Sequence, residues 1–139
     1  MNNENEKPEL SDHTTSASPV ATPKTGFSRL LPALLNSFAG MTSTFRSETA
    51  FRQELAGFVI LFPAALVLGQ SAVERALLIA PLFLVLILEL VNTALEHTVD
   101  RWGPEYNEHA KLTKDAGSAA VFLGLTLIVV TWTLVLFGG

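Results

Sequence analysis

The chain has 139 residues and a net charge of −4, with 49% hydrophobic residues and no cysteine. This length fits one domain, and the lack of cysteine excludes disulfides, thiolate metal sites and thiol nucleophiles. The mild acidity argues against a nucleic-acid partner. Because the hydrophobic content is only slightly above a globular average, it is the distribution of the apolar residues that indicates a membrane protein.

The first 25 residues differ in composition from the rest of the chain. They hold few large apolar residues, many serines and threonines, and Pro8, Pro19 and Pro23. Such a segment cannot bury enough apolar surface to offset the entropy lost on ordering. It also lacks the basic start and apolar stretch of a signal peptide. We therefore expect a disordered tail over residues 1–25 and one membrane domain over residues 26–139.

An amphipathic helix is predicted over about residues 27–50. Its opposite face is polar and includes Arg29 and Arg46. Such a helix can lie in the plane of a membrane surface or pack in a soluble core, and the apolar runs that follow favour the membrane surface. The apolar residues recur at steps of three and four and form one stripe, namely Phe27, Leu30, Leu31, Leu34, Leu35, Phe38, Met41 and Phe45.

Three long apolar runs follow, Leu55–Leu68, Ala76–Leu95 and Ala119–Phe137. The second and third approach the ~20 residues that a spanning helix needs, and the first needs its polar flank to cross about 30 Å of bilayer. A buried soluble helix is the alternative for the first run, but the sequence has no large polar domain to cover it. We predict an all-α membrane protein with a surface helix and three transmembrane spans, at about residues 53–70, 75–98 and 116–137.

The basic residues predict the orientation of these spans. Residues 24–54 hold four and the loop between the second and third spans holds three, whereas the opposite side has only Arg75. The positive-inside rule then places the N-terminus and the second loop in the cytoplasm and the C-terminus outside. The polar residues at the end of the second run and before the third run would then lie at the cytoplasmic end.

Small residues recur on the third span at Gly117, Ala120 and Gly124. Small residues at such steps let helices approach closely in lipid, and we interpret them as packing positions. The sequence contains no zinc motif, P-loop or other glycine-rich phosphate motif.

The second span carries a stripe of polar residues, Glu89, Asn92, Glu96 and Asp100. At 100° per residue they fall within about 80° of one helix face. A carboxylate among leucines and valines in a membrane costs at least a few kcal/mol, so it is a functional candidate that needs a partner. The alternative is a polar helix–helix contact that only holds an oligomer together.

Two carboxylates on this face, about 10 Å apart by helical rise, can perform two tasks. Glu96 can help to hold a hard cation such as Mg²⁺, with Glu48 as a second oxygen ligand. The deeper Glu89 can accept a proton from a hydroxyl, since a buried carboxylate is suited to base work near neutral pH. His97 and Asp100 are an alternative set of metal ligands together with Glu96.

Lys114 and Asp115 precede the third apolar run. We expect Lys114 to lie at a helix start beside free backbone N–H groups, where it could clamp a phosphate. Asp115 could orient this lysine or cap the helix.

Four motifs, at residues 48–54 (ETAFRQE), 89–101 (ELVNTALEHTVDR), 105–106 (EY) and 114–120 (KDAGSAA), resemble the prokaryotic diacylglycerol kinase family. The resemblance covers roughly residues 26–137. It implies a surface helix, three spans and a homotrimer in the bacterial inner membrane, with active sites between subunits at the cytoplasmic surface. It also implies transfer of the ATP γ-phosphate, with Mg²⁺, to diacylglycerol, giving phosphatidic acid.

The resemblance assigns a role to each matching residue. Glu89 is implied as the catalytic base, and Glu48 and Glu96 as the metal ligands. The implied ATP-binding residues are Arg29, Glu48, Glu96, Glu105, Lys114 and Asp115. The implied lipid-binding residues are Arg29, Gln53, Glu54, Glu89, Asn92 and Ser118.

The sequence departs from the family pattern at Pro32, Asn36 and Asn107, which stand where a basic residue, Tyr and His are usual. The Lys111-Leu-Thr segment leans toward a sister group from Gram-positive bacteria that phosphorylates undecaprenol, which is the alternative acceptor. Asp100-Arg101 and Gly117-Ser-Ala-Ala lean back toward diacylglycerol. A non-enzymatic membrane subunit or proton-relay element is the alternative from another class, and Lys114-Asp115 beside Glu96 argues against it.

Overall fold

The structure, a computed structural model, describes residues 29–101 and 107–138. Within these ranges the chain forms four helices, which confirms the predicted all-α class: α1 (Leu30–Ser47), α2 (Thr49–Leu68), α3 (Ala72–Asp100) and α4 (Glu108–Phe137). The tail predicted over residues 1–25 lies outside the described residues.

Three of these helices, α2, α3 and α4, are long and apolar enough to cross a membrane. With 29 and 30 residues, α3 and α4 exceed the roughly 20 residues that span a bilayer, so each is long enough to extend beyond the hydrocarbon region. The ends of the helices differ from those expected, because α4 already begins at Glu108 and α3 continues to Asp100. Many of their large apolar side chains are exposed, as is expected of helices whose solvent is lipid.

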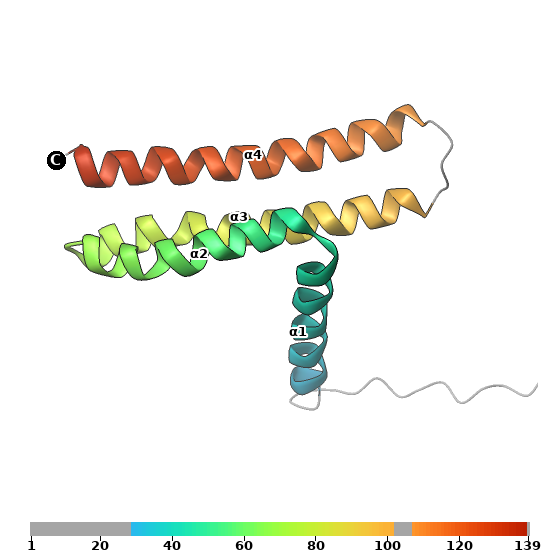
Figure 1. Cartoon of the computed structure of the whole chain (residues 1–139), viewed down its shortest axis with the longest axis horizontal. Coiled ribbons are helices and arrows are strands. Elements are labelled where there is room, and N and C mark those ends of the chain that lie inside the picture. The colour runs from blue at the N-terminus through green and yellow to red at the C-terminus, as the bar shows by residue number, and fades with distance from the viewer. Residues whose placement is uncertain (1–28, 102–106, 139) are drawn as a thin grey trace, which may run out of the picture.

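The three long helices run alongside one another, and α1 lies across one end of this bundle (Figure 1). Helix α3 is the central element, since it contacts each of the other three helices. Half of the buried residues in the described part of the chain belong to α3, more than to any other helix. Polar groups near the middle of the inner face of α3 are therefore enclosed by its neighbours.

The turn between α2 and α3 is closed by a network of local hydrogen bonds. Ser71 Oγ caps α3 by accepting from Glu74 N at 3.1 Å, and Glu74 accepts from Gln70 N at 2.8 Å, as in a capping box. Arg75 Nε donates to Gly69 O at 2.9 Å. A Cβ at Gly69 would lie 3.0 Å from the Ala65 carbonyl oxygen and the Arg75 nitrogen, so this tight turn needs glycine.

Helices α3 and α4 approach closely at small residues of α4. A Cβ at Gly124 would lie 3.0 Å from Val85 Cγ2 and 2.9 Å from Leu88 Cδ1. Farther along, Trp132 Nε1 donates to the Leu78 carbonyl oxygen at 3.1 Å. The packing role predicted for Gly124 is confirmed.

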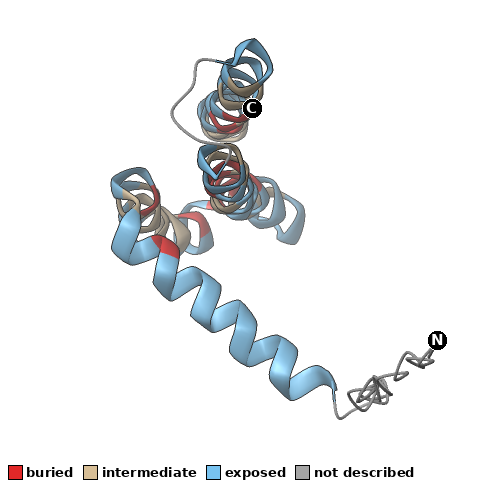
Figure 2. Ribbon diagram, turned by 90° about the vertical axis from the view of Figure 1, so that its right-hand side faces the viewer, coloured by how far each residue is buried: buried red, intermediate tan, exposed pale blue. Residues whose placement is uncertain are grey.

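The helix predicted over residues 27–50 is interrupted at Glu48. This residue is extended, with φ −104° and ψ 122°, and separates α1 from α2. Within α1 only Thr44 is buried, and the predicted apolar stripe from Leu30 to Phe45 is exposed (Figure 2). An isolated helix with an exposed apolar stripe fits the interfacial role that we expected of it.

Candidate functional site

The polar stripe of α3 runs from buried to exposed along the helix. Glu89 is 4% exposed and Asn92 is 8% exposed, whereas Glu96 is half-buried and Asp100 is exposed. The gradient arises because the middle of α3 is flanked by both α2 and α4, whereas its last turns extend past the start of α2 and have α4 beside them (Figure 1). The stripe that the sequence predicted therefore connects the bundle interior to its polar end.

Asn92 is held in place by contacts on both sides of its amide. Its Nδ2 donates to Glu96 Oε1 at 3.3 Å, while its buried Oδ1 has no hydrogen-bond partner among the described residues. A Cβ at Gly117 on α4 would overlap this oxygen. Gly117, which we interpreted as a packing position, thus also makes room for a polar side chain of the stripe.

Glu48 approaches the stripe from the junction of α1 and α2. Together with Glu96, His97, Asp100 and Arg101 it lines a cavity of about 320 Å³. Glu48 Oε1 lies 3.7 Å from His97 Nε2 of α3. The structure thus brings Glu48 and Glu96 to one cavity, as the sequence suggested.

The position of Glu48 depends on Arg52, a residue to which the sequence analysis gave no role. One Arg52 guanidinium nitrogen donates to the carbonyl oxygens of Phe45 at 3.2 Å and Arg46 at 3.3 Å. The other donates to Thr49 Oγ1 at 2.8 Å. Since these contacts join the end of α1 to the first turn of α2, they fix the bend at which Glu48 lies.

The donor chemistry of this cavity suits a hard cation. Magnesium is commonly held by one or two carboxylates, with waters and substrate phosphates completing its shell. Glu48 and Glu96 supply two carboxylates on one cavity. Across the described residues there is no group of three or more acidic, His or Cys side chains arranged for a metal, so the alternative set of Glu96, His97 and Asp100 is not supported.

The structure corrects the predicted surroundings of Lys114. Helix α4 begins at Glu108, and Asn107 Oδ1 caps it by accepting from His109 N at 2.9 Å and Ala110 N at 3.4 Å. Lys114 therefore lies in the second turn, not beside free N–H groups. It forms an ion pair with Asp100 instead, at 2.5 Å between Nζ and Oδ1.

Asp115 has neither of the two local roles that its position suggested, and its implied contact with ATP stays a prediction. It lies on the exposed side of α4, where its Oδ2 accepts from Lys111 Nζ at 2.7 Å. It neither caps the helix nor contacts Lys114, because neighbouring helical residues point about 100° apart. The same spacing turns Ser118, which is exposed, away from the stripe that its neighbour Gly117 faces.

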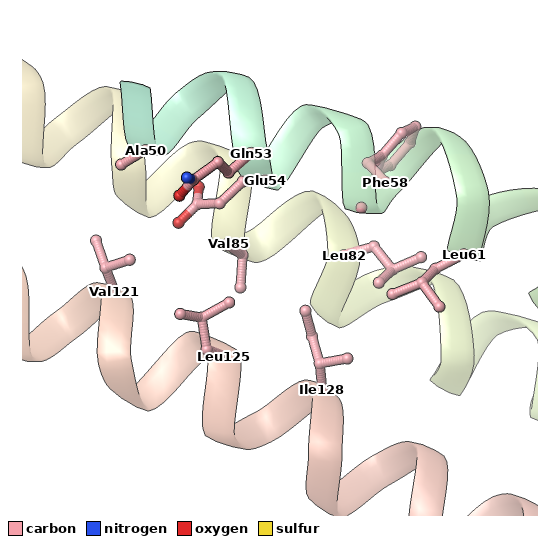
Figure 3. Close-up of a pocket in the computed structure, with 11 residues that line it drawn as sticks. Ala50, Gln53, Glu54, Phe58, Leu61, Leu82, Val85, Val121, Leu125 and Ile128 are labelled. Carbon is pink, nitrogen blue, oxygen red and sulfur yellow. The ribbon is translucent and has the colours of Figure 1, made fainter. Parts of the chain in front are cut away.

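An apolar groove of about 420 Å³ lies between α2, α3 and α4 (Figure 3). Gln53 and Glu54 form its polar end, and Glu54 Oε2 is buried without a hydrogen-bond partner in the described part of the chain. The rest of its lining is Ala50, Gly57, Phe58, Leu61, Leu82, Val85, Val121, Leu125 and Ile128.

Along α3, Glu89 falls between residues that line the groove and residues that line the polar cavity. Val85, one helical turn before Glu89, lines the groove, and Glu96, two turns after it, lines the cavity. Of the other predicted site residues, Arg29 lies at the far end of α1 from Glu48, and Glu105 lies outside the described residues.

Comparison with known proteins identifies relatives along most of the chain. The sequence model of the family described as prokaryotic diacylglycerol kinase matches residues 35–136. A protein of Pseudomonas aeruginosa named diacylglycerol kinase is 49% identical over 115 residues, which are 83% of this chain and 94% of that protein. One of Escherichia coli strain K12 with the same name is 39% identical over 118 residues, 85% of this chain and 97% of that protein.

Because the carboxylate of Glu89 is buried, we predict that it lowers the stability of the folded protein. We expect Glu89→Gln to raise the free energy of unfolding by roughly 1–2 kcal/mol, because an amide is cheaper to bury than a carboxylate. Thermal unfolding in detergent micelles measures the change. Glu96→Gln is the matched control, and it should give no such gain because Glu96 is more exposed and accepts a hydrogen bond from Asn92. A lower unfolding temperature for Glu89→Gln than for the unaltered protein would contradict the interpretation.

Proposed function

The chain belongs to the prokaryotic diacylglycerol kinase family, and on this basis we propose that it transfers the γ-phosphate of ATP to diacylglycerol, giving phosphatidic acid and ADP. The observation that carries the proposal is the location of Glu89 between an apolar groove and a polar cavity. A kinase that transfers phosphate from a water-soluble nucleotide to a membrane lipid needs such a boundary.

In this proposal Glu89 is the general base. Its carboxylate accepts the proton of the lipid hydroxyl while the hydroxyl oxygen forms a bond to the γ-phosphorus. The bond from this phosphorus to the oxygen bridging the β-phosphate breaks, and ADP leaves with that oxygen. Phosphoryl transfer depends mainly on positioning and on neutralising charge. A base, a cation site and a lysine at one boundary therefore suffice, without a separate nucleotide-binding fold.

The polar cavity is the proposed nucleotide side of the site. Glu48 and Glu96 would hold Mg²⁺, which when bound neutralises charge on the phosphates. Lys114 would donate to phosphate oxygens. Family resemblance adds Arg29, Glu105 and Asp115 to the nucleotide contacts.

The apolar groove is the proposed lipid side. An acyl chain fits its aliphatic and aromatic lining, and the glycerol hydroxyls fit the polar end, where the buried Glu54 oxygen offers an acceptor. Gln53 shares that end of the groove. Family resemblance adds Arg29, Asn92 and Ser118 as further lipid contacts.

We propose that the protein is a homotrimer in the bacterial inner membrane, with its N-terminus in the cytoplasm and its C-terminus outside. The basic residues favour this orientation. Within one chain, Arg29, Asp115 and Ser118 lie apart from the stripe of α3, which supports a site completed by a second copy. The exposed apolar stripe of α1 supports its location in the cytoplasmic membrane interface.

The reaction is tested with purified protein in mixed micelles, given ATP, Mg²⁺ and either diacylglycerol or undecaprenol. We expect phosphatidic acid from diacylglycerol and a slower reaction with undecaprenol. Glu89→Gln should lower the rate by about 10²–10⁴-fold because it removes the base, while the size of the assembly is unchanged. Unaltered turnover in Glu89→Gln would remove the proposed base, and faster phosphorylation of undecaprenol would reassign the acceptor.

The role of the groove as the lipid site is tested by placing a larger side chain at Gly57, so that it occupies the groove. An added Cβ there meets no atom within 4 Å. We expect Gly57→Leu to raise the KM for diacylglycerol by about tenfold, since the new side chain occupies the space of an acyl chain. The KM for ATP should stay within about twofold of the original, because the nucleotide side is unaltered. Ala56→Leu, on the exposed side of the same helix, is the matched control. Equal KM values for diacylglycerol in the two variants would exclude the groove as the lipid site.

The orientation is tested by single cysteines, which the natural sequence lacks. The variants are His97→Cys at the polar end of α3 and Gln70→Cys in the turn between α2 and α3, both at exposed positions. A membrane-impermeant maleimide should label the His97→Cys variant only in inside-out vesicles and the Gln70→Cys variant only in intact cells. The reverse pattern would invert the proposed topology.

A further inference from the structure

Lys114 lies on the face of α4 that meets α3. Gly117, Val121 and Gly124 on the same stripe are all buried, and Gly117 lies against Asn92. Because residues three and four apart share one side of a helix, Lys114 must project toward the last turns of α3. The family motif places an acid next to it in sequence, at Asp115, but that acid lies on a different face.

Two ion pairs distinguish the two candidate acids. Lys114 Nζ lies 2.5 Å from Asp100 Oδ1 across the two helices. Asp115 is instead paired with Lys111 within α4, at 2.7 Å between Oδ2 and Nζ. The carboxylate that restrains the Lys114 ammonium is therefore that of Asp100.

The location of Asp100 is unfavourable for its own helix. It is the last residue of α3, where the free carbonyl groups repel a carboxylate by about 0.3–1 kcal/mol. Helix stability therefore does not account for an acidic residue at this position, whereas the contact with Lys114 does. Asp100 also lines the cavity that contains Glu48 and Glu96, one helical turn beyond Glu96, so it holds the ammonium at the rim of that cavity.

We propose that Asp100 is a positioning residue, which holds Lys114 at the carboxylate cavity so that its ammonium meets the nucleotide phosphates. The inference rests on the proposed function. A lysine ammonium has three donors, so Lys114 can keep its contact with Asp100 while it donates to a phosphate oxygen. A restrained ammonium loses less entropy on binding than a freely moving one.

The first experiment compares Asp100→Asn with the unaltered protein in the lipid kinase assay. The KM for ATP should rise by about tenfold as the restraint on Lys114 is lost. The KM for diacylglycerol and the unfolding temperature should not change. If Asp100 had a merely structural role, its replacement would change these two quantities as well. Asp100→Glu should restore most of the ATP affinity. Glu108→Gln, which removes an exposed acid from the first turn of α4, is the control and should leave the KM for ATP unchanged.

The second experiment measures binding of a fluorescent ATP analogue, because Lys114→Met is expected to be inactive. If Asp100 acts through Lys114, the double variant should bind no more weakly than Lys114→Met alone. The inference would be overturned if the double variant bound the analogue more weakly than Lys114→Met, by the factor that Asp100→Asn alone loses. It would also be overturned if Asp100→Asn left the KM for ATP unchanged. Neither result would affect the proposed kinase function. An unaltered protein without activity on either lipid would instead refute the proposed function.

Discussion

Burial of polar side chains inside a bundle that stands in lipid is the constraint on which the rest of this structure depends. Glu89 and Asn92 are almost fully enclosed, and a membrane interior offers no water to satisfy them. Their burial requires α3 to lie centrally, with α4 close enough at Gly117 for its backbone to pass the Asn92 amide. The small residues of α4 thus serve both the packing of the helices and the location of the polar stripe.

A second constraint is the bend at Glu48. One extended residue ends α1, begins α2 and directs a carboxylate to the cavity that Glu96 lines. Arg52 keeps this bend closed through the carbonyl oxygens that the end of α1 leaves free. Because the same residue joins the helices and lines the cavity, any change in how α1 lies against the membrane would also move a proposed metal ligand.

The proposed site has an apolar part for the lipid and a charged part for the metal nucleotide. The groove between the long helices is apolar except for its Gln53 and Glu54 end, while the outer cavity is lined by charged side chains. A lipid can enter the first laterally, and a metal nucleotide can reach the second from water. Glu89 lies on α3 between the two, and the proposed base role would account for a carboxylate at a depth where burial is costly.

The sequence by itself determined the helices and the polar stripe of α3. Helical periodicity is a local property, so Glu89, Asn92, Glu96 and Asp100 share a face whatever surrounds them. The family motifs likewise identified Glu48, although nothing local showed that a bend would bring it to Glu96. The start of α4 was predicted wrongly even though its signal was present, since Asn107 followed by Glu108 is a good helix cap.

Only the tertiary structure decided which side chains meet across helices. Whether Lys114 contacts Asp115 or Asp100 depends on which face of α4 lies against α3, and this follows from close approach at Gly117 and Gly124. The groove between α2, α3 and α4 and the anchoring of Glu48 by Arg52 depend on the same packing. Such contacts join residues that are distant along the chain or that flank a bend, so no pattern of local spacing could specify them.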